Sequence, residues 1–261
     1  MKRFYFISIF LHLIVLSFAQ DRDLTLNEKI AIKNLEDHII SNRIDVVAKQ
    51  ISYPLCRNEY YNYNIDSEEV FRQKFYSIFD ENQKKSFCEL NWRCLYLKYL
   101  MDDGGYYSWQ ASGFCGYFND DGIFYLDIIP LSNIEIKFIK QLIEEEKLSL
   151  HTSIRNYKEP VCLIHVGKYR IRIDRMHDGS IRYTSWKTNA PISAEPDIII
   201  YNGKMFGNRW HTTFEFTNAG HKYTLIDAEL DGSPVLSITK GNTVLFETDY
   251  DVEYSFKYFN W

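Results

Sequence analysis

The sequence predicts an α+β protein whose N-terminal half mixes helices with strands and whose C-terminal half contains strands alone. Apolar residues recur every three or four positions at 27–51, 66–79 and 134–147, which is the spacing of amphipathic helices. From Val161 onward the apolar positions instead alternate in short runs, and turn residues separate these runs as in antiparallel β domains. We therefore expect a sheet covered by helices, followed by an all-β unit.

The composition is typical of a packed chain that does not bind nucleic acid. The 261 residues include 20 Tyr and 18 Phe but only 12 Gly and 6 Pro, so long linkers and disorder are not expected. The formal net charge of −5 provides no extended positive field for a phosphate backbone. A nucleic-acid partner is therefore not expected.

The first residues have the parts of a secretory signal. Lys2 and Arg3 precede a mainly apolar run that ends at the small residue Ala19. This run is short for a membrane span, and charged residues follow it directly from Asp21. We expect cleavage after Ala19 or Gln20 and no stable membrane span in the mature chain. The expected product is a soluble exported protein, periplasmic or extracellular.

The residues after the signal predict three helices and then three strands. The pattern at 27–51 fits two short helices that break around Ser41-Asn42. Asp66 or Ser67 is expected to cap a third helix that continues to residue 79. Strands are expected in three aromatic-rich stretches, Phe87–Leu100, Tyr106–Tyr117 and Ile123–Ile129.

Three segments of this half carry a resemblance to a known family. They are AKQISYPL (Ala48–Leu55), EEVFRQKFYSIFD (Glu68–Asp80) and ASGFCGYFNDDGIFYLDI (Ala111–Ile128). Their order after the first helices resembles the NTF2-like cone fold of small exported bacterial proteins, over 27–130. The resemblance implies a strongly bent antiparallel sheet that helices cover and that encloses a pocket. Isomerases, dehydratases, carriers, immunity proteins and interaction modules all use this shape, so it does not select a function.

A further helix and a connector are expected between the two halves. The helix covers Ile134–Lys147, and three acidic residues, Glu144, Glu145 and Glu146, lie near its C-terminal end. Because acidic side chains at that end oppose the helix dipole, we expect the end to be frayed and exposed. Leu150–Pro160 is expected to be an irregular connector.

Nine strand signals follow, with the spacing of a β-sandwich or a small barrel. They lie at Val161–Val166, Tyr169–Arg175, Ile181–Trp186, Asp197–Tyr201, His211–Phe216, Tyr223–Glu229, Val235–Thr239, Thr243–Glu247 and Val252–Phe256. The run IRYTSWKTNAPISAEPDIIIYNG resembles the C-terminal β module of exported bacterial proteins of uncharacterised function. That resemblance implies architecture and no activity.

These signals divide the chain into four parts. We expect a signal peptide at 1–20, an NTF2-like domain at 24–147, a connector at 148–160 and a C-terminal antiparallel β domain at 161–261.

Two alternating runs in Lys168–Lys187 predict a β-hairpin that turns near Asp178-Gly179. A two-residue loop would mix apolar and polar residues on both faces of this hairpin. A three-residue loop that begins at His177 keeps the two kinds of residue on separate faces. Because a slip of one residue would turn the apolar side chains to water, we expect the three-residue loop, with Gly179 at positive φ.

The three-residue loop determines which residues lie opposite each other. Asp174 is expected opposite Arg182, and Arg170 opposite Trp186. We expect Gly179→Val to destabilise the protein strongly and Arg182→Ala to cost little stability, because Arg182 would lie on a solvated face. The residues expected on that face are Lys168, Arg170, Arg172, Asp174, Arg182, Thr184 and Trp186.

The polar face of this hairpin is the best candidate for a binding surface. Arginine and tryptophan contribute most of the contact energy in many interfaces. The candidate binding residues are Arg170, Arg172, Arg182, Trp186 and Trp210. The alternative interpretation is the ordinary outer face of an antiparallel sheet, where long charged side chains cover a tryptophan without any functional role.

No motif in the sequence identifies an active site. The Gly-x-Ser-x-Gly nucleophile elbow and the glycine-rich phosphate loops are absent, and no CxxC or HxxxH spacing indicates a metal site. We expect no metal and no cofactor. If the cone pocket supports acid–base chemistry, the nearest candidates are Tyr106, Tyr107 and Asp127. Asp102 and Asp103 are better explained as turn residues.

Five cysteines remain after the signal, at Cys56, Cys88, Cys94, Cys115 and Cys162. Disulfides can form in an exported protein, but the odd number leaves at least one cysteine outside any internal pair. We expect mainly buried thiols, with at most one bridge in the first domain.

The sequence thus favours a non-catalytic exported binding protein, with immunity proteins among the possible types. The expected partner is a protein, a peptide or a glycan. The alternative is a small-molecule enzyme or carrier that uses the NTF2-like pocket. A buried carboxylate that faces a tyrosine or a histidine in that pocket would favour the alternative.

Overall fold

The structure, a computed structural model, describes residues 22–58, 61, 63–90, 96–100, 106–119, 123–207, 211–228 and 235–255. Within these ranges, helices and strands are mixed up to Ser149 and only strands and one short 3₁₀ turn follow, so the α+β class is confirmed. The signal peptide expected at 1–20 lies outside these ranges. None of the described helices has the length and apolar character needed to cross a membrane.

Four helices precede β4 in the chain: α1 (Leu26–Ile40), α2 (Ile44–Ala48), α3 (Glu68–Ile78) and α4 (Glu81–Cys88). The predicted break at Ser41-Asn42 is confirmed, since α1 ends at Ile40 and Asn42 has a positive φ of 53°. Ser67 caps α3, because its side chain accepts a hydrogen bond from the Val70 N–H.

Helix α4 corrects one expectation from the sequence. Phe87 was assigned to a strand, yet it is the buried apolar residue of α4. The Asp80 carboxylate accepts a hydrogen bond from the Gln83 N–H at 2.8 Å and so starts this helix. Strand β4 begins only at Tyr96. The aromatic residues in this stretch had suggested a strand, and the N-cap signal at Asp80 was not recognised.

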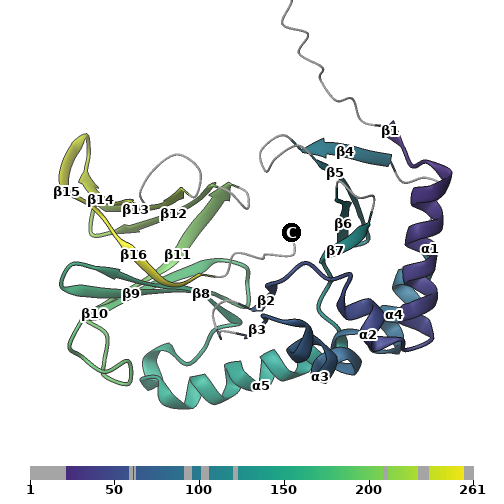
Figure 1. The fold of residues 1–261 in the computed structure, drawn as a ribbon. Coiled ribbons are helices and arrows are strands. Elements are labelled where there is room, and N and C mark those ends of the chain that lie inside the picture. Colours follow the sequence, from purple (N-terminus) through teal and green to yellow (C-terminus); the bar gives the residue numbers. More distant parts are fainter. Residues whose placement is uncertain are drawn as a thin grey trace, which may run out of the picture.

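The helices pack on one face of a five-stranded sheet (Figure 1). Its strands are β1 (Arg22–Asp23), β4 (Tyr96–Leu100), β5 (Tyr106–Ala111), β6 (Phe114–Phe118) and β7 (Phe124–Ile128), in the order β1-β4-β5-β6-β7. Phe114, Phe124 and Leu126 pack with helix residues such as Phe71 and Phe75 in one apolar core. A separate pair, β2 (Leu55–Asn58) and β3 (Tyr63–Ile65), lies between the helices and α5.

Helix α5 (Asn133–Ser149) extends from the first helices to the second sheet along the lower side of Figure 1. At its start, Ser132 and Glu135 form a capping box. Towards its end, Ile139 and Ile143 pack with Trp186 in a third buried cluster. Therefore α5 contacts the β2–β3 pair at its start and the large sheet towards its end. The helix continues to Ser149, so the expected fraying is wrong, although Glu144 and Glu145 are exposed as expected.

Nine strands follow a short 3₁₀ turn, η1 (Thr152–Ile154), and all nine strand predictions are confirmed. They are β8 (Glu159–Val166), β9 (Tyr169–Arg175), β10 (Ile181–Lys187), β11 (Ile198–Gly207), β12 (His211–Asn218), β13 (His221–Ala228), β14 (Val235–Lys240), β15 (Thr243–Asp249) and β16 (Asp251–Ser255). They form one antiparallel sheet in the order β15-β14-β13-β12-β11-β10-β9-β8-β16.

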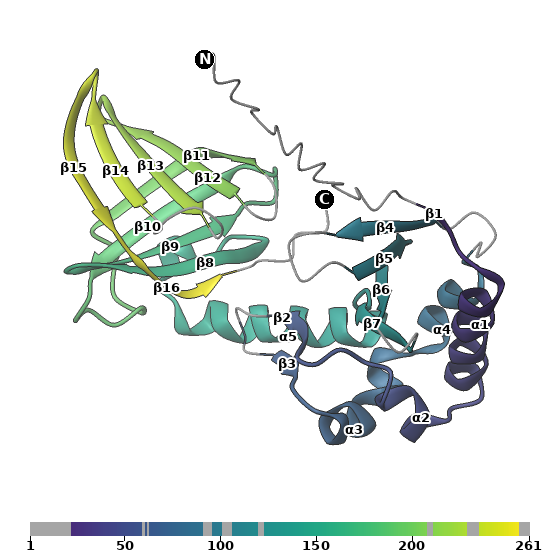
Figure 2. The same ribbon diagram turned by 45° about the horizontal axis from the view of Figure 1, so that its top comes forward.

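This sheet curls so that β11 to β15 lie over β8 to β10, as Figure 2 shows. Its inner face is apolar and includes Ile173, Tyr183, Phe216 and Leu225. The two edge strands, β15 and β16, are consecutive in the chain and are separated only by Tyr250, which is buried in the same core. A single residue, Tyr250, therefore connects the two edge strands of the sheet.

Candidate functional site

The hairpin formed by β9 and β10 has the predicted register. Asp174 lies opposite Arg182, Ile173 opposite Tyr183 and Arg170 opposite Trp186. In the three-residue loop, Gly179 has a φ of +86°. Asp178 stabilises the turn, since its carboxylate accepts hydrogen bonds from the backbone N–H and the hydroxyl of Ser180. These bonds lower the pKa of Asp178 below its ordinary value.

The polar face of the hairpin is buried, which corrects the expectation of an exposed face. The exposed fractions of Arg172, Arg182 and Trp186 are 0%, 1% and 0%. The end of α5 and the segment at 150–157 cover these side chains. The strand pattern could not reveal this cover, because alternation identifies two faces and does not say whether a distant helix packs on the polar one.

The buried charges of this face compensate one another. Asp174 accepts from Arg172 Nε with one oxygen and from Arg182 Nη2 with the other, at 2.7 Å each. Arg172 also donates to both oxygens of Glu146 at the end of α5, at 2.6 and 3.0 Å. Arg182 donates in addition to the Ile154 carbonyl oxygen at 2.6 Å. Two arginines and two acids therefore form a neutral network that joins α5 to the sheet.

Two tyrosines complete this network. The Tyr157 hydroxyl donates to Glu146 Oε2 at 2.6 Å, and the Tyr61 hydroxyl donates to the same oxygen at 3.2 Å. Burial raises the pKa of both hydroxyls well above the ordinary tyrosine value, so both remain protonated donors. The Arg172 guanidinium also lies 4.8 Å from the centre of the Tyr157 ring. These contacts indicate that Glu146, Arg172 and Arg182 have a structural role.

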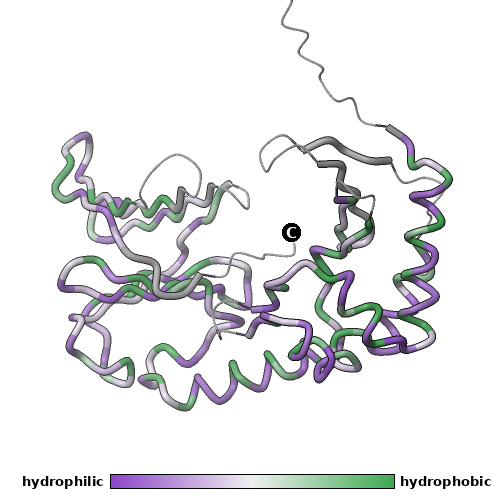
Figure 3. Tube along the Cα trace, in the orientation of Figure 1, coloured by the Kyte–Doolittle hydropathy of each residue, from purple (hydrophilic) through white to green (hydrophobic). Residues whose placement is uncertain are grey.

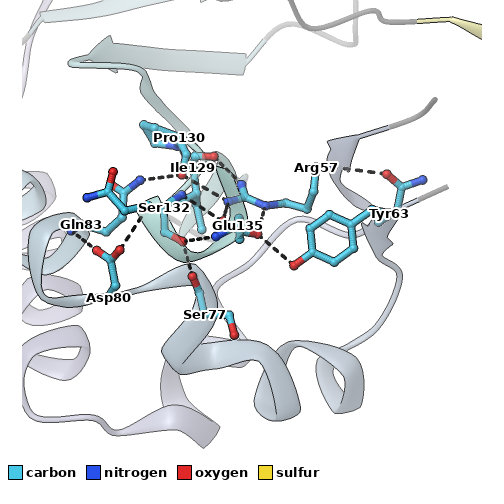
Figure 4. A network of polar contacts seen from close by, with 11 residues as sticks. Arg57, Tyr63, Ser77, Asp80, Gln83, Ile129, Pro130, Ser132 and Glu135 are labelled. Carbon is cyan, nitrogen blue, oxygen red and sulfur yellow. Dashed lines mark hydrogen bonds and ion pairs between the residues drawn. The ribbon is translucent and has the colours of Figure 1, made fainter. Parts of the chain in front are cut away.

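A second buried network holds the start of α5 (Figure 4). Arg57, in β2, forms a two-pronged ion pair with Glu135 and also donates to the Ile129 and Pro130 carbonyl oxygens. The side chains of Arg57 and Glu135 are at most 1% exposed. The Tyr63 hydroxyl donates to Glu135 at 3.3 Å.

This second network contains the buried carboxylate and tyrosine that an acid–base site would need. Burial and the nearby Glu135 charge raise the pKa of Tyr63 to about 12. However, Arg57 and the Ser132 N–H already occupy both oxygens of Glu135. The arrangement therefore anchors α5 to β2, and no carboxylate oxygen is left to accept a substrate proton. The capping box could be seen in the sequence, but the partner Arg57 could not, because 78 residues separate it from Glu135.

The residues expected for a cone pocket are only partly described. Tyr106 and Tyr107 begin β5, where their backbones pair with Leu100 and Tyr99 of β4. Asp127 lies in β7 and is exposed, and β6 separates β5 from β7 in the sheet. Asp102 and Asp103 lie outside the described residues. An exposed Asp127 does not provide the shielded carboxylate that acid–base chemistry in such a pocket requires.

The cysteines and possible metal ligands offer no further site in the described part of the chain. Cys162 is buried, whereas Cys56, Cys88 and Cys115 are half-buried. Cys94 lies outside the described residues, so the disulfide expectation stays a prediction. Within the described ranges, no three His, Cys, Asp or Glu side chains are grouped to hold a metal ion.

An open pocket lies at the end of the hairpin that is opposite to the Gly179 loop. We call it the hairpin pocket; it has a volume of about 480 Å³ and is lined by Gly167, Lys168, Tyr169, Lys187, Thr188 and Asn189. Lys187 pairs with Tyr169 across the two strands, and the Thr188 N–H donates to the Lys168 carbonyl oxygen at 2.9 Å. Lys168 precedes the first residue of β9 and Lys187 is the last residue of β10, so the two lysines lie at the same end of two adjacent strands.

The candidate residue Arg170 lies next to the hairpin pocket. It is half-buried, its guanidinium lies 5.8 Å from the Trp186 ring centre, and it donates to the Ala190 carbonyl oxygen. Trp186 is itself covered by the loop after β10, and its indole N–H donates to the Ala194 carbonyl oxygen. The fifth candidate, Trp210, lies outside the described residues. Of the five candidate binding residues, Arg170 is thus the one that the structure describes as partly accessible to solvent.

The hairpin pocket carries positive charge that neighbouring acids do not balance. Lys168 and Lys187 are exposed, and neither makes an ion pair within the described ranges. One carboxylate lies beside the pair, since Asp197 accepts a hydrogen bond from the Lys187 backbone N–H at 3.1 Å. Tyr169 is 50% exposed and adds an aromatic surface. The pocket is thus locally basic in a chain of net charge −5.

Comparison with known proteins does not assign this chain to a family. No family model matches the sequence, and the searches of curated proteins and of solved structures give no match.

Proposed function

We propose that this protein is an exported, non-catalytic binding protein and that its hairpin pocket holds an anionic group of a peptide or a glycan. The observation that carries the proposal is the pair of exposed lysines, Lys168 and Lys187, beside the exposed ring of Tyr169. Lysine binds carboxylate, sulfate or phosphate groups as a mobile point charge. The Thr188 hydroxyl and the Asn189 amide lie in the same lining and can bind hydroxyl or amide groups beside the charge.

The expected strength of the lysine contacts limits the kind of ligand. An exposed ion pair contributes at most about 1 kcal/mol, so two lysines contribute about 2 kcal/mol together. A dissociation constant of about 1 mM already requires about 4 kcal/mol. The ligand must therefore also contact Tyr169 or the polar side chains. A repeating acidic chain that places several groups along the surface meets this requirement better than a single small anion.

We also infer the finer features of the fold that the sequence resemblance suggests. For an NTF2-like arrangement at 24–147, the support is the antiparallel sheet β1-β4-β5-β6-β7 with helices packed on one face. For the C-terminal sheet we favour a small barrel over a sandwich. The support is the single residue, Tyr250, between its two edge strands. Export is supported by the basic and apolar pattern of the first residues.

The ligand class can be tested with three probes of different chemistry. The mature protein is titrated with a poly-glutamate peptide, with a polyuronate glycan and with the neutral glycan dextran, and binding is followed by calorimetry. We expect binding of an acidic probe that weakens as salt rises, because exposed charges are screened. The stronger acidic probe identifies the partner as peptide or glycan. Equal binding of dextran would contradict the role of charge.

A matched pair of variants assigns this binding to the hairpin pocket. Replacing Lys168 and Lys187 together by Gln should weaken binding about tenfold, since two exposed ion pairs are lost. Replacing Lys158 and Lys240 by Gln removes the same charge from exposed positions away from the pocket and should leave binding unchanged. If both double variants bind like the unaltered protein, the hairpin pocket is not the site.

A further inference from the structure

The lining of the hairpin pocket combines polar groups with one aromatic ring. Apart from Gly167, each lining residue has a side chain with a polar atom; these residues are Lys168, Tyr169, Lys187, Thr188 and Asn189. The loop that begins with Thr188 after β10 is drawn mostly in neutral and hydrophilic colours in Figure 3. Among the described lining residues, the Tyr169 ring is therefore the main apolar surface that a ligand can contact.

The backbone around the pocket is already paired, which disfavours a peptide ligand that adds a strand. In the large sheet, β9 lies between β8 and β10, and β10 lies between β9 and β11. Just beyond β10, the Thr188 N–H donates to the Lys168 carbonyl oxygen at 2.9 Å and continues this pairing. Extended peptides bind by hydrogen bonding to a free sheet edge, and helical peptides place apolar anchors in a groove. The described residues of the hairpin pocket provide neither.

Tyr169 and Lys187 are direct partners across the hairpin, so their side chains leave the same face of the sheet. The Cβ atoms of such a pair lie about 5 Å apart. A ligand that contacts both side chains must therefore carry an anionic group close to a surface that can stack on an aromatic ring. A uronic acid has this arrangement, because its carboxylate is attached directly to the sugar ring. In a glutamate peptide, the carboxylate instead ends a flexible side chain that contains no ring.

We propose that the hairpin pocket binds an acidic glycan, with a uronic acid unit stacked on Tyr169 and its carboxylate beside Lys187. Lys168, at the same end of the hairpin, binds the carboxylate of a neighbouring acidic unit. The Thr188 hydroxyl and the Asn189 amide form hydrogen bonds with the sugar hydroxyls. The pocket volume of about 480 Å³ lies within the usual range for small-molecule sites. The inference rests on the proposed role of the hairpin pocket as the binding site and names the class of its ligand.

Calorimetric titration of the mature protein with three probes of equal length tests the ligand class. The probes are an oligogalacturonate, a neutral oligogalactose and an oligoglutamate. We expect the oligogalacturonate to bind about tenfold more tightly than the oligogalactose, which lacks carboxylates, and about three- to tenfold more tightly than the oligoglutamate, which lacks the sugar ring. If the oligoglutamate binds as tightly as the oligogalacturonate, the glycan assignment is wrong and the anion site remains. If neither acidic probe binds, the proposed function fails as well.

Substitutions at position 169 test the stacked ring. Tyr169→Leu should weaken binding of the oligogalacturonate about three- to tenfold and leave binding of the oligoglutamate unchanged, whereas Tyr169→Phe should bind normally because it keeps the ring. Tyr201→Leu is the matched control: Tyr201 is 47% exposed, against 50% for Tyr169, and lies on β11 beside Arg182. This control should bind both acidic probes normally. No loss in Tyr169→Leu, or an equal loss in Tyr169→Phe, would overturn the stacking arrangement.

The dependence on salt separates the contribution of the ring from that of the lysines. The factor by which Tyr169→Leu weakens binding of the oligogalacturonate should be the same at low and high salt, because stacking involves no net charge. The effect of replacing Lys168 and Lys187 by Gln should instead shrink as salt screens the exposed charges. Circular dichroism of each variant checks that the fold is retained. A Tyr169→Leu effect that disappears at high salt would show that the substitution acts through the lysines, and it would contradict the stacked sugar.

Discussion

Asp174 and Arg182 lie directly opposite each other in the β9–β10 hairpin and form an ion pair of 2.7 Å that is almost completely shielded from water. The side chain of Asp174 is 0% exposed and that of Arg182 is 1% exposed. The same carboxylate also binds Arg172. One acidic residue therefore neutralises parts of two buried guanidinium groups, and this makes Asp174 the centre of the contact between the large sheet and α5.

We predict that Asp174→Asn destabilises the protein by about 3–5 kcal/mol, because it leaves buried arginine charge without compensation. Denaturant unfolding of the two proteins measures the difference. Asp45→Asn is the control, since Asp45 pairs with Arg72 in an exposed ion pair and is 84% exposed; its loss should cost far less than the loss of Asp174, because solvent screens an exposed pair. Equal effects of the two substitutions would contradict the structural role of the buried network.

For the same reason, Arg182→Ala is now expected to be strongly destabilising. The sequence had suggested a small cost, on the assumption that Arg182 faces water. Its side chain instead donates to Asp174 and to the Ile154 and Asn156 carbonyl oxygens. Removing it leaves these buried acceptors without their donor, at a cost of about 3 kcal/mol or more. A thermal melt that is unchanged by Arg182→Ala would refute this.

We predict that Gly179→Val lowers the free energy of unfolding by at least about 1–2 kcal/mol through the backbone alone. Gly179 has a φ of +86°, and a Cβ at this position would meet no atom within 4 Å. The cost therefore comes from the left-handed conformation and not from crowding. Gly179→Asn separates the two causes, because Asn tolerates positive φ and should cost less than Val. Equal losses for Asn and Val would indicate that the loop responds to side-chain size.

Stability should fall in alkaline solution because buried tyrosines resist ionisation. Burial raises the pKa of Tyr63 and of Tyr183 to about 12 each, from an ordinary value of 10.0. A raised pKa favours the protonated folded state, so this stabilisation is fully present below pH ~10 and is lost as the pH rises towards ~12. Denaturant unfolding at several pH values, with tyrosinate absorbance in parallel, measures the effect. Tyr63→Phe should reduce the fall; an unchanged pH dependence in this variant would contradict the assignment.

Fragments of the chain should show that α5 belongs to the stability of the large sheet. The fragment 161–261 lacks α5 and the 150–157 segment, so it would expose Trp186 and Arg172, which are fully buried in the whole chain. The fragment 133–261 keeps this cover. We predict that the longer fragment is more stable by several kcal/mol, from the apolar area it buries. Denaturant unfolding and amide dispersion compare the two, and equal stability would refute the role of α5.

The large sheet is the part of the fold that the sequence predicts best. Alternation of apolar and polar residues over short distances is a local property, and it was sufficient for nine strands and for the register at Gly179. A slip of one residue would have exposed Ile173 and Tyr183, and the free energy of burying such side chains exceeds any preference for a turn type. The caps at Ser67 and Ser132 were local signals of the same kind.

The sequence by itself therefore determined which residues of the hairpin share a face, and the tertiary structure alone decided that both faces are buried. Helix α5 and the segment after it cover Arg172, Arg182 and Trp186. Glu146 accepts a hydrogen bond from Arg172 and Ile154 accepts one from Arg182, and in each pair the two residues are 26 or more positions apart in the sequence. The pairing of Arg57 with Glu135 over 78 residues has the same origin. A local sequence pattern always predicts that a charged side chain is exposed to solvent. Its burial becomes possible only when folding brings an opposite charge next to it, and that charge can come from a distant part of the chain.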